Sequence, residues 1–290
     1  MNNSNQPWPA PAKLNLFLHI LGRREDGYHL LQTVFQFLDY GDEIIISVRK
    51  DDEINLNADY VRVDMDEDLV VKAAKMLQQK LQQPRGADIQ VNKRLPIGGG
   101  LGGGSSDAAT TLVALNKLWD VGLSEVELAE MGLILGADVP VFVYGCAAWA
   151  EGVGERLTPV SLPDGWFIVI YPGFSVSTEQ IFASTYLTRN TAAITIRDFL
   201  AGAGRNDCES VACMLHPEIE NVLRWLDKKA EGARMTGTGS CVFSVFHTKQ
   251  EAQAVLLELP QDWQGFVAHG KNTSPLLDRL AQSPGMFSSR

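Results

Sequence analysis

A glycine tract that runs directly into a predicted helix is the feature that most constrains this chain. Residues 95–111 read Leu-Pro-Ile-Gly-Gly-Gly-Leu-Gly-Gly-Gly-Ser-Ser-Asp-Ala-Ala-Thr-Thr. Glycines let backbone N–H groups converge because no Cβ stands between them, and a helix that begins near Ser105 adds unpaired N–H groups and the positive end of its dipole. This combination predicts an anion site, and its natural ligand is a phosphate group.

A flexible linker is the alternative interpretation, because glycine and serine also compose linkers. The flanking sequence favours a phosphate loop. An apolar Leu-Pro-Ile segment at 95–97 precedes the tract, and apolar residues at helical spacing follow it, namely Ala108, Leu112, Leu115, Leu118 and Trp119.

Two familiar phosphate-binding patterns fit the tract only in part. Residues 98–103 satisfy G-x-G-x-x-G, but the dinucleotide fold then requires a second strand ending in an acidic residue, whereas residues 123–135 have helical spacing. Residues 99–106 imitate G-x-x-x-x-G-K-[ST], with Ser105 where the lysine should stand. A P-loop without its lysine lacks the charge that reaches the β- and γ-phosphates, so a cation must come from elsewhere in the chain.

Length and charge limit the function classes. A chain of 290 residues with 45% hydrophobic content predicts one large or two ordinary domains with a core that needs no disulfides. A net charge of −10 argues against non-specific binding to nucleic acid or to anionic membranes. Anionic substrates would need a local basic cluster, and its candidates are Lys13, Arg23, Arg24, Lys93 and Arg94. Lys13 and Lys93 are favoured because each has apolar neighbours, whereas Arg23 and Arg24 fit a solvated surface equally well.

The cysteines and the N-terminus predict a cytoplasmic protein. The four cysteines form no C-x-x-C pair, so neither a zinc ribbon nor a disulfide framework is expected for Cys146, Cys208, Cys213 and Cys241. Residues 1–11 form a polar, proline-rich tail without the basic and apolar regions of a signal peptide. Residues 131–150 carry a single charge over a length that could cross a bilayer, but glycines and a proline interrupt them, so no span is predicted.

That single charge is Asp138, a carboxylate in apolar sequence. Burying a carboxylate is costly unless it is paired or used in chemistry. The alternative is an aspartate that caps its own turn, because residues 137–140 suggest the end of a helix and a turn before a buried strand at 141–143. The pattern by itself leaves both interpretations open.

Hydrophobic periodicity predicts strands and helices along the whole chain. Strands are expected over residues 13–20, 34–38, 43–48, 87–92, 141–143, 166–171 and 242–246. Helices are expected over residues 68–82, from near 105, and over 123–135, 177–186, 196–200, 207–214, 218–229 and 249–259, with the last ten residues loose. A second small glycine loop at 235–241 suggests a cleft between two domains, 1–160 and 161–290.

Three motifs in this order resemble the GHMP small-molecule kinases, a family named for galactokinase and the homoserine, mevalonate and phosphomevalonate kinases. They are Pro-Ala-Lys-Leu-Asn-Leu at 11–16, the glycine tract at 96–106 and Thr-Gly-Thr-Gly at 236–239. Segments at 22–29, 136–140 and 151–155 look like the branch that acts on a cytidine diphosphate-linked methylerythritol in non-mevalonate isoprenoid biosynthesis. The resemblance spans roughly residues 8–280.

The resemblance implies an α+β fold of two domains. The N-terminal domain, 1–160, would be ribosomal S5 domain 2-like and carry the phosphate loop. The C-terminal domain, 161–290, would be ferredoxin-like and close the substrate cleft. The implied activity is ATP-dependent phosphorylation of the substrate's 2-hydroxyl group.

The same resemblance assigns site residues. Asp138 matches the catalytic base and Lys13 the lysine that polarises the substrate hydroxyl. The ATP side comprises Lys93, Pro96, Gly98, Gly99, Gly100, Leu101, Gly102, Gly103, Gly104, Ser105 and Ser106. The substrate side comprises Asn15, Tyr28, His29, Val153, Thr178, Phe182, Gly237 and Thr238, with Tyr28 and Phe182 sandwiching the cytosine and His29 bonding its edge. Without the resemblance, Phe182 would be interpreted as a core aromatic.

ATP and Mg²⁺ are the implied cofactors, and no obligatory protein partner is expected. No carboxylate is assigned to the metal, although the Ser105 or Ser106 hydroxyl could contribute, as in other phosphate loops. The sequence departs from the family pattern at two positions: Asp68 replaces a common asparagine near adenine, and Glu179 replaces a frequent proline.

Two other functions remain open at this point. Another member of the family, such as a homoserine or mevalonate kinase, would not need the Gly-Tyr-His context at 27–29. A catalytically inactive sensor on the same fold would not need to retain both Lys13 and Asp138.

Overall fold

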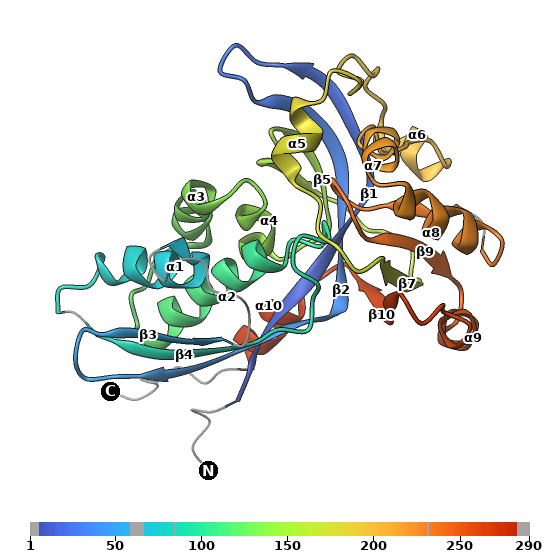
Figure 1. Cartoon of the computed structure of the whole chain (residues 1–290). Helices are drawn as coiled ribbons and strands as arrows, with labels where there is room; N and C mark the ends of the chain where they lie inside the picture. The colour runs from blue at the N-terminus through green and yellow to red at the C-terminus, as the bar shows by residue number, and fades with distance from the viewer. Residues whose placement is uncertain (1–5, 59–66, 84, 231, 283–290) are drawn as a thin grey trace.

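A long antiparallel hairpin forms the centre of the molecule (Figure 1). The computed structural model describes residues 6–58, 67–83, 85–230 and 232–282. Strand β1 (Trp8–Arg23) pairs with strand β2 (His29–Val48) along nearly its whole length. Gly41 lies where the two backbones approach each other, because a Cβ there would be 2.2 Å from the Ala10 carbonyl oxygen. The hairpin extends from one end of the molecule to the other (Figure 1), so its side chains contribute to several parts of the fold.

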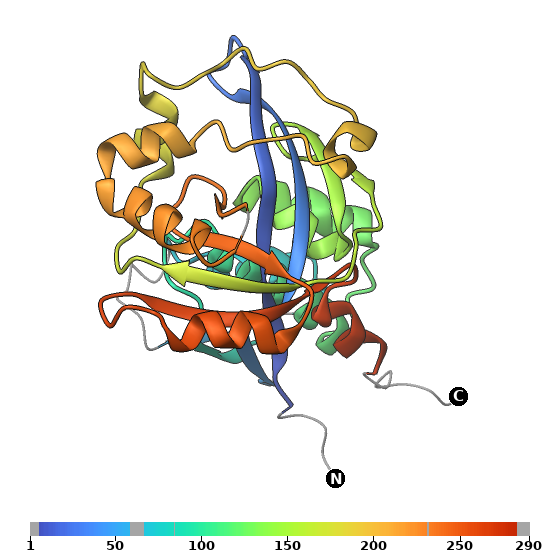
Figure 2. The same ribbon diagram turned by 90° about the vertical axis from the view of Figure 1, so that its right-hand side faces the viewer.

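The other strands extend the sheet from this hairpin. Among the described residues the order is β3-β4-β2-β10-β7-β9-β8, and β1 and β5 pair with β2 outside this path. The bounds are β3 (Ile54–Ala58), β4 (Ala87–Asn92), β5 (Ala148–Gly152), β6 (Arg156–Pro159), β7 (Trp166–Tyr171), β8 (Arg234–Met235), β9 (Val242–Phe246) and β10 (Gln264–Lys271). Figure 2 shows β7, β9 and β10 crossing the hairpin.

One group of helices packs beside the hairpin next to β3 and β4 (Figure 1). It comprises α1 (Leu69–Gln78), α2 (Gly103–Leu118), α3 (Glu125–Leu135), α4 (Val139–Tyr144) and α10 (Pro275–Ala281). Their apolar faces share one core with strands β1, β2 and β4, around the buried Trp119 and Phe142. Leu276 of α10 lies in this core, so the end of the described chain returns to the N-terminal half.

A second group of helices packs on β7 and β9. It comprises α5 (Thr178–Ala183), α7 (Glu209–Leu215), α8 (Pro217–Asp227) and α9 (Lys249–Leu257). Helix α6 (Ile196–Leu200) packs instead beside Phe17 and Trp149. Side chains of α5, α7, α8 and α9 form a separate core with Ile168 and Ile170 of β7. Leu18 and Ile20 of β1 reach this second core, so the hairpin connects both.

Most of the expected elements are confirmed in type, with shifted ends. The expected strands at 34–38 and 43–48 are one continuous strand, β2. The expected strand at 141–143 is wrong, because these residues lie in helix α4. Pro140 suits the first turn of a helix, and Gly145 ends the helix at a φ of 59°. Strands β3, β5, β6, β8 and β10 and helix α10 were not predicted.

The chain ends and the cysteines bear on three further predictions. Strand β1 begins at Trp8, so the predicted tail is shorter than expected. The C-terminus was expected to be loose over residues 281–290. Ala281 and Gln282 belong to the end of α10, and residues 283–290 lie outside the described residues. All four cysteines are free thiols, as expected. No helix within the described ranges is long and apolar enough to cross a membrane.

Candidate active site

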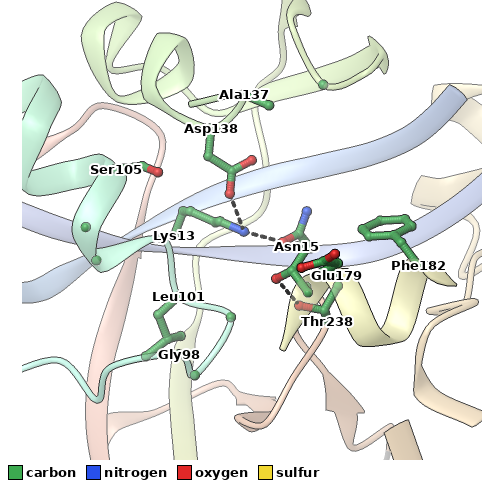
Figure 3. A pocket seen from close by; sticks show the side chains of 18 of the residues that line it. Lys13, Asn15, Gly98, Leu101, Ser105, Ala137, Asp138, Glu179, Phe182 and Thr238 are labelled. Atoms are coloured by element: carbon green, nitrogen blue, oxygen red, sulfur yellow. Dashed lines mark hydrogen bonds and ion pairs between the residues drawn. The ribbon is translucent and has the colours of Figure 1, made fainter. Parts of the chain in front are cut away.

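One cavity of about 1010 Å³ brings together residues from distant parts of the chain. Its wall includes β1, the turn before β2, the glycine loop, the start of α4, α5 and the late glycine loop (Figure 3). Every site residue predicted above lines it except Ser106, which is buried beside it. Asp68 and Glu179, the two residues that depart from the family pattern, also line the cavity. The Asp68 carboxylate accepts a hydrogen bond from the Val70 N–H group and caps α1.

Lys13 and Asp138 form an ion pair at the wall of this cavity (Figure 3). Lys13 Nζ lies 3.2 Å from Asp138 Oδ2 and donates a hydrogen bond to Asn15 Oδ1. The Lys13 side chain is only 4% exposed, whereas that of Asp138 is 36% exposed. Asp138 precedes α4 but makes no side-chain capping bond. The turn-capping alternative for Asp138 is therefore wrong, and its carboxylate is available to a bound molecule.

The carbonyl groups of the glycine loop are held by the rest of the protein. Gly98 O and Gly99 O accept from the N–H groups of Val176 and Cys241, at 3.3 and 3.1 Å. The Gly100 carbonyl accepts from Thr236 Oγ1, and the Leu101 carbonyl accepts from Lys13 N at 3.0 Å. Four successive carbonyls thus have partners outside the loop. Because α2 begins at Gly103, the N–H groups of its first turn have no partner within the helix.

Glycine is required at two of these positions. Gly100 has a φ of 79°, and a Cβ there would lie 2.3 Å from the Thr236 carbonyl oxygen. Gly102 has a φ of 73°, and a Cβ there would lie 2.8 Å from the Phe142 ring. Side chains other than glycine rarely adopt this left-handed region. The loop therefore packs closely against the late glycine loop and α4, which a flexible linker would not do.

Lys93 lies behind the loop between two buried carboxylates. Its Nζ lies 2.6 Å from Asp42 Oδ2 and 2.8 Å from Asp107 Oδ2. The N–H groups of Arg94 and Leu95 donate to Asp42 Oδ1, at 2.6 and 2.8 Å. Asp107 Oδ1 is buried without a partner. Burial, with the nearby Asp42 charge, raises the pKa of Asp107 to about 7 despite the attraction of Lys93.

The other basic candidates divide between the cavity and the surface. Arg23 lines the cavity. Arg24 pairs with Asp26 at 2.6 Å, and both side chains are about half exposed. Arg94 pairs with Glu43 at 3.3 Å on the surface. Three of the five candidates therefore reach the cavity.

The late glycine loop joins the two halves of the cavity wall. Asn15 N donates to Thr236 Oγ1 at 2.9 Å, and Thr178 Oγ1 lies 2.9 Å from Thr238 Oγ1. Asn206 Nδ2 donates to the carbonyls of Met235 and Gly237, both at 2.8 Å. These bonds connect residues that are far apart in the sequence.

Aromatic side chains form the end of the cavity next to α5. The rings of His29 and Phe182 stack with their centroids 4.9 Å apart. The Tyr28 side chain is 63% exposed. Arg189 Nε donates to His29 Nε2 at 3.0 Å. Burial and the charges of Arg189 and Arg23 lower the pKa of His29.

Comparisons with known proteins identify the chain. Residues 68–146 match the GHMP kinases N terminal domain, and residues 188–265 match the GHMP kinases C terminal domain. A protein of Alkalilimnicola ehrlichii named 4-diphosphocytidyl-2-C-methyl-D-erythritol kinase is 57% identical over 273 residues, with 94% of each chain covered. A protein of the same name from Nitrosococcus oceani is 54% identical over 95% of this chain and 98% of its own.

This chain belongs to the 4-diphosphocytidyl-2-C-methyl-D-erythritol kinases of the GHMP family. It is therefore an ATP-dependent small-molecule kinase with the expected α+β GHMP-kinase fold. A crystal structure of 4-(cytidine 5'-diphospho)-2C-methyl-D-erythritol kinase superposes with a TM-score of 0.80 and 32% identity, covering 91% of this chain and 99% of its own. The Methanococcus jannaschii mevalonate kinase, at 18% identity and a TM-score of 0.66, covers 94% of this chain and 100% of its own and shares only the fold.

Sequence reasoning missed several residues of this kinase site. Asp42, Asp107 and Thr236 hold the glycine loop and its lysine, while Asn206 and Arg189 position the late glycine loop and His29. Asp107 directly follows the two serines of the glycine tract, and this position could have identified it as a site residue. Thr236 belongs to the Thr-Gly-Thr-Gly motif at 236–239. Asp42, Arg189 and Asn206 come from segments with no phosphate-binding pattern, and only the fold brings them next to residues of the cavity wall.

Proposed function

We propose that this kinase transfers the γ-phosphoryl group of ATP to the 2-hydroxyl of 4-diphosphocytidyl-2-C-methyl-D-erythritol, in non-mevalonate isoprenoid biosynthesis. The names of relatives at 54–57% identity support this substrate. The observation that carries the proposed chemistry is the Lys13–Asp138 pair, because it puts a cation and an accessible carboxylate at the wall of a cavity that also includes a phosphate loop.

In this mechanism Asp138 takes the proton of the attacking hydroxyl as the hydroxyl oxygen bonds to the γ-phosphorus. The bond between the γ-phosphorus and the bridging oxygen of the β-phosphate breaks, and ADP leaves. Lys13 stabilises the developing alkoxide, since its ammonium group lies 3.2 Å from the carboxylate that takes the hydroxyl's proton. Asn15 fixes the ammonium by accepting its hydrogen bond. Phosphoryl transfer needs mainly positioning and charge stabilisation, which these three side chains supply.

The glycine loop binds the ATP phosphates in the proposal. Its carbonyls are occupied by bonds to the rest of the protein, and this arrangement leaves the N–H groups at the start of α2 for an anion. Pro96 and residues 98–105 line the cavity and belong to this side. Two of the three N–H donors of the Lys93 ammonium group already bond to Asp42 and Asp107. Lys93 therefore contributes to ATP binding by holding the loop in place. Ser106 is buried behind the loop and contacts it through its backbone, because its N–H group donates to the Gly102 carbonyl at 2.8 Å.

Mg²⁺ fits the oxygen atoms at the start of α2. Mg²⁺ in kinase sites uses one or two protein oxygens together with phosphates and waters, so a large acidic cluster is not required. No group of three or more metal-ligating side chains occurs within the described ranges. The Ser105 hydroxyl and the Asp107 carboxylate, both at the cavity wall, are the proposed ligands. When bound, the ion would neutralise charge on the transferred phosphoryl group.

The cytidine end of the substrate would bind near α5. Tyr28 and Phe182 supply the aromatic faces, and His29 supplies a polar ring atom. Val153, Thr178, Gly237 and Thr238 line the path from this end towards Asp138 and would contact the sugar, the methylerythritol and the diphosphate. The exposed Tyr28 ring is available to stack on a base from the open side.

The test measures ADP release with ATP, Mg²⁺ and 4-diphosphocytidyl-2-C-methyl-D-erythritol. Asp138→Asn should lower kcat by roughly 10²–10⁴-fold, because the base is lost. Lys13→Met should lower kcat by roughly 10²–10³-fold, because a preorganised charge is lost. The matched control is Asp262→Asn, which changes an exposed aspartate on a surface turn and should leave kcat unchanged.

Each possible outcome has a defined meaning. Normal turnover by Asp138→Asn would overturn the assignment of Asp138 as the base. It would not affect the assignment of the substrate. Turnover of mevalonate or homoserine in place of the cytidine substrate would favour another GHMP activity. Binding of ATP and of the substrate without any turnover by the wild type would favour a sensor.

A further inference from the structure

Arg189 contacts both halves of the aromatic end of the cavity. Its Nε donates to His29 Nε2 at 3.0 Å, at the start of β2. Its Nη2 donates to the carbonyls of Phe182 and Ser184, at 2.7 and 2.8 Å, at the end of α5. Its Nη1 donates to the Leu187 carbonyl at 3.1 Å. One guanidinium group therefore links the hairpin turn to α5 through four hydrogen bonds.

These bonds determine the protonation state of the His29 ring. A guanidinium group has only N–H donors and stays protonated in proteins, so the atom that it contacts must accept. Nε2 of His29 must therefore carry a lone pair and no proton. The imidazole is then neutral, and its single N–H group is on Nδ1.

The electrostatic environment favours the same state. The charged groups that act on His29 are Arg189, from the segment after α5, and Arg23, from the end of β1. Both are cations, and a second positive charge on the imidazole would be repelled by both. Partial burial adds to this effect, and together they lower the pKa of His29.

We propose that Arg189 is a positioning residue for base recognition, which holds His29 as the neutral Nδ1–H tautomer and fixes its ring against Phe182. This inference rests on the proposed function. Cytosine presents two acceptors, O2 and N3, on the edge that His29 is proposed to contact. A fixed Nδ1–H donor matches an acceptor on that edge, whereas a ring free to exchange tautomers would match it only part of the time.

The first experiment uses the protein without substrate. Long-range ¹H–¹⁵N NMR spectra distinguish the two imidazole tautomers, and a His29→Gln variant identifies the His29 signals among those of the five histidines. In the wild type, His29 should remain neutral with Nδ1 protonated down to a pH well below 6.5. In Arg189→Met, its pKa should rise, because one repelling cation is removed, and Nε2 should become protonated. An Nε2–H tautomer in the wild type would overturn the inference.

The second experiment is a double-mutant cycle on substrate turnover. Arg189→Met should raise KM for the cytidine substrate about tenfold or more at pH 8, with little change in KM for ATP. The rise should be smaller at pH 6, because a protonated imidazole carries an N–H group on both ring nitrogens. Arg224→Met is the control, because it removes an arginine whose side chain is exposed on the surface of α8. If Arg189 acts through His29, adding Arg189→Met to His29→Gln should change KM by less than twofold.

The cycle also detects a purely structural role. Arg189 also holds the carbonyls of Phe182, Ser184 and Leu187, in the last turn of α5 and just after it. Its loss would loosen that segment without involving His29 if its role were purely structural. In that case the two single-variant effects would multiply in the double variant, and the inference would be overturned. Failure of the proposed function is distinguishable, because a wild type that does not turn over this substrate would still give the tautomer spectrum.

Discussion

At the scale of single residues, the most constrained group is the pair of carboxylates that share Lys93. Both oxygens of the buried Asp42 have partners, namely Lys93 and two backbone N–H groups. In the part of the chain that the structure describes, one oxygen of Asp107 contacts Lys93 and the other has no hydrogen-bond partner. The charged form of Asp107 is therefore poorly satisfied, in agreement with its raised pKa.

This difference predicts a pH dependence of stability. Because burial raises the pKa of Asp107 from 3.8 to about 7, the folded state binds a proton more tightly than the unfolded state between these values. The stabilisation from this group is complete below pH 3.8 and is lost as the pH rises through about 7. Asp107→Asn cannot titrate, so its free energy of unfolding should fall less between pH 5.5 and pH 8 than that of the wild type.

Urea denaturation at the two pH values measures this effect. Asp262→Asn is the control, because it removes an exposed carboxylate of the same type. Its free energy of unfolding should change with pH as in the wild type. An Asp107→Asn variant with the wild-type pH dependence would show that Asp107 is ionised throughout this range.

At the scale of elements, the backbone of the glycine loop is fixed on one side. The carbonyls from Gly98 to Leu101 bond to three other segments of the fold, so the loop is preformed for the proposed binding of ATP. A preformed loop loses little conformational entropy on binding. A flexible glycine tract would lose more, since glycine has the largest backbone freedom.

Gly100→Ala tests this arrangement against a matched glycine. Gly100 and Gly122 both have a φ of 79°, but a Cβ at Gly122 would meet no atom within 4 Å. Gly122→Ala should therefore destabilise the protein by only about 1–2 kcal/mol, the cost of the left-handed conformation. Gly100→Ala adds a clash with the Thr236 carbonyl, so it should destabilise more and raise KM for ATP at least tenfold.

Denaturation curves and ATP kinetics of both variants give the comparison. Equal effects of the two substitutions on stability, with an unchanged KM for ATP, would show that the contact between the loop and Thr236 has no role in binding ATP.

Helix α4 illustrates how an element positions a side chain that we propose to be catalytic. Its short apolar run is buried, and such a run fits a strand or a helix equally well. As a helix it directs Asp138, the residue before its first turn, towards Lys13 on β1. The strand predicted at 141–143 could not have indicated that Asp138 points towards Lys13, because this orientation depends on the helix.

At the scale of the whole molecule, the site depends on contacts between the N-terminal and C-terminal halves. The division at residue 160 stays a prediction, and β10 and α10 return from the C-terminal half to β2 and to the N-terminal core. Thr236 is central to these contacts, because its hydroxyl accepts from Asn15 N and donates to the Gly100 carbonyl. It thus connects β1, the glycine loop and the late glycine loop.

Thr236→Val should weaken this connection. The substitution keeps the shape but leaves the buried Asn15 N–H without its acceptor, at a cost of about 1–3 kcal/mol. Because Asn15 holds Lys13, kcat should also fall. Thr111→Val is the matched control: Thr111 is equally buried, but its hydroxyl bonds only to the Asp107 carbonyl one turn earlier in its own helix.

Thermal melts and steady-state kinetics of both variants test the prediction. Thr111→Val should keep wild-type kcat. A Thr236→Val variant with the kcat and stability of Thr111→Val would show that the contact between the halves does not support catalysis.

The sequence by itself determined the family, the phosphate loop and most elements in type. These features depend on local chemistry: glycines that permit a left-handed φ, apolar spacing, and motifs in a fixed order. Such signals lie within a few neighbouring residues. Lys13 and Lys93 could be selected for the same reason, since each is a charge among apolar neighbours.

Only the tertiary structure decided how these residues act together. The sequence left Asp138 between a turn cap and a functional carboxylate. The structure shows no capping bond from its side chain, and the approach of Lys13 from β1 supports the proposed catalytic role. It gave no sign that Arg189 contacts His29, 160 residues earlier. Hydrogen bonds and ion pairs between distant segments depend on where the whole chain places each side chain, and no local pattern encodes that placement.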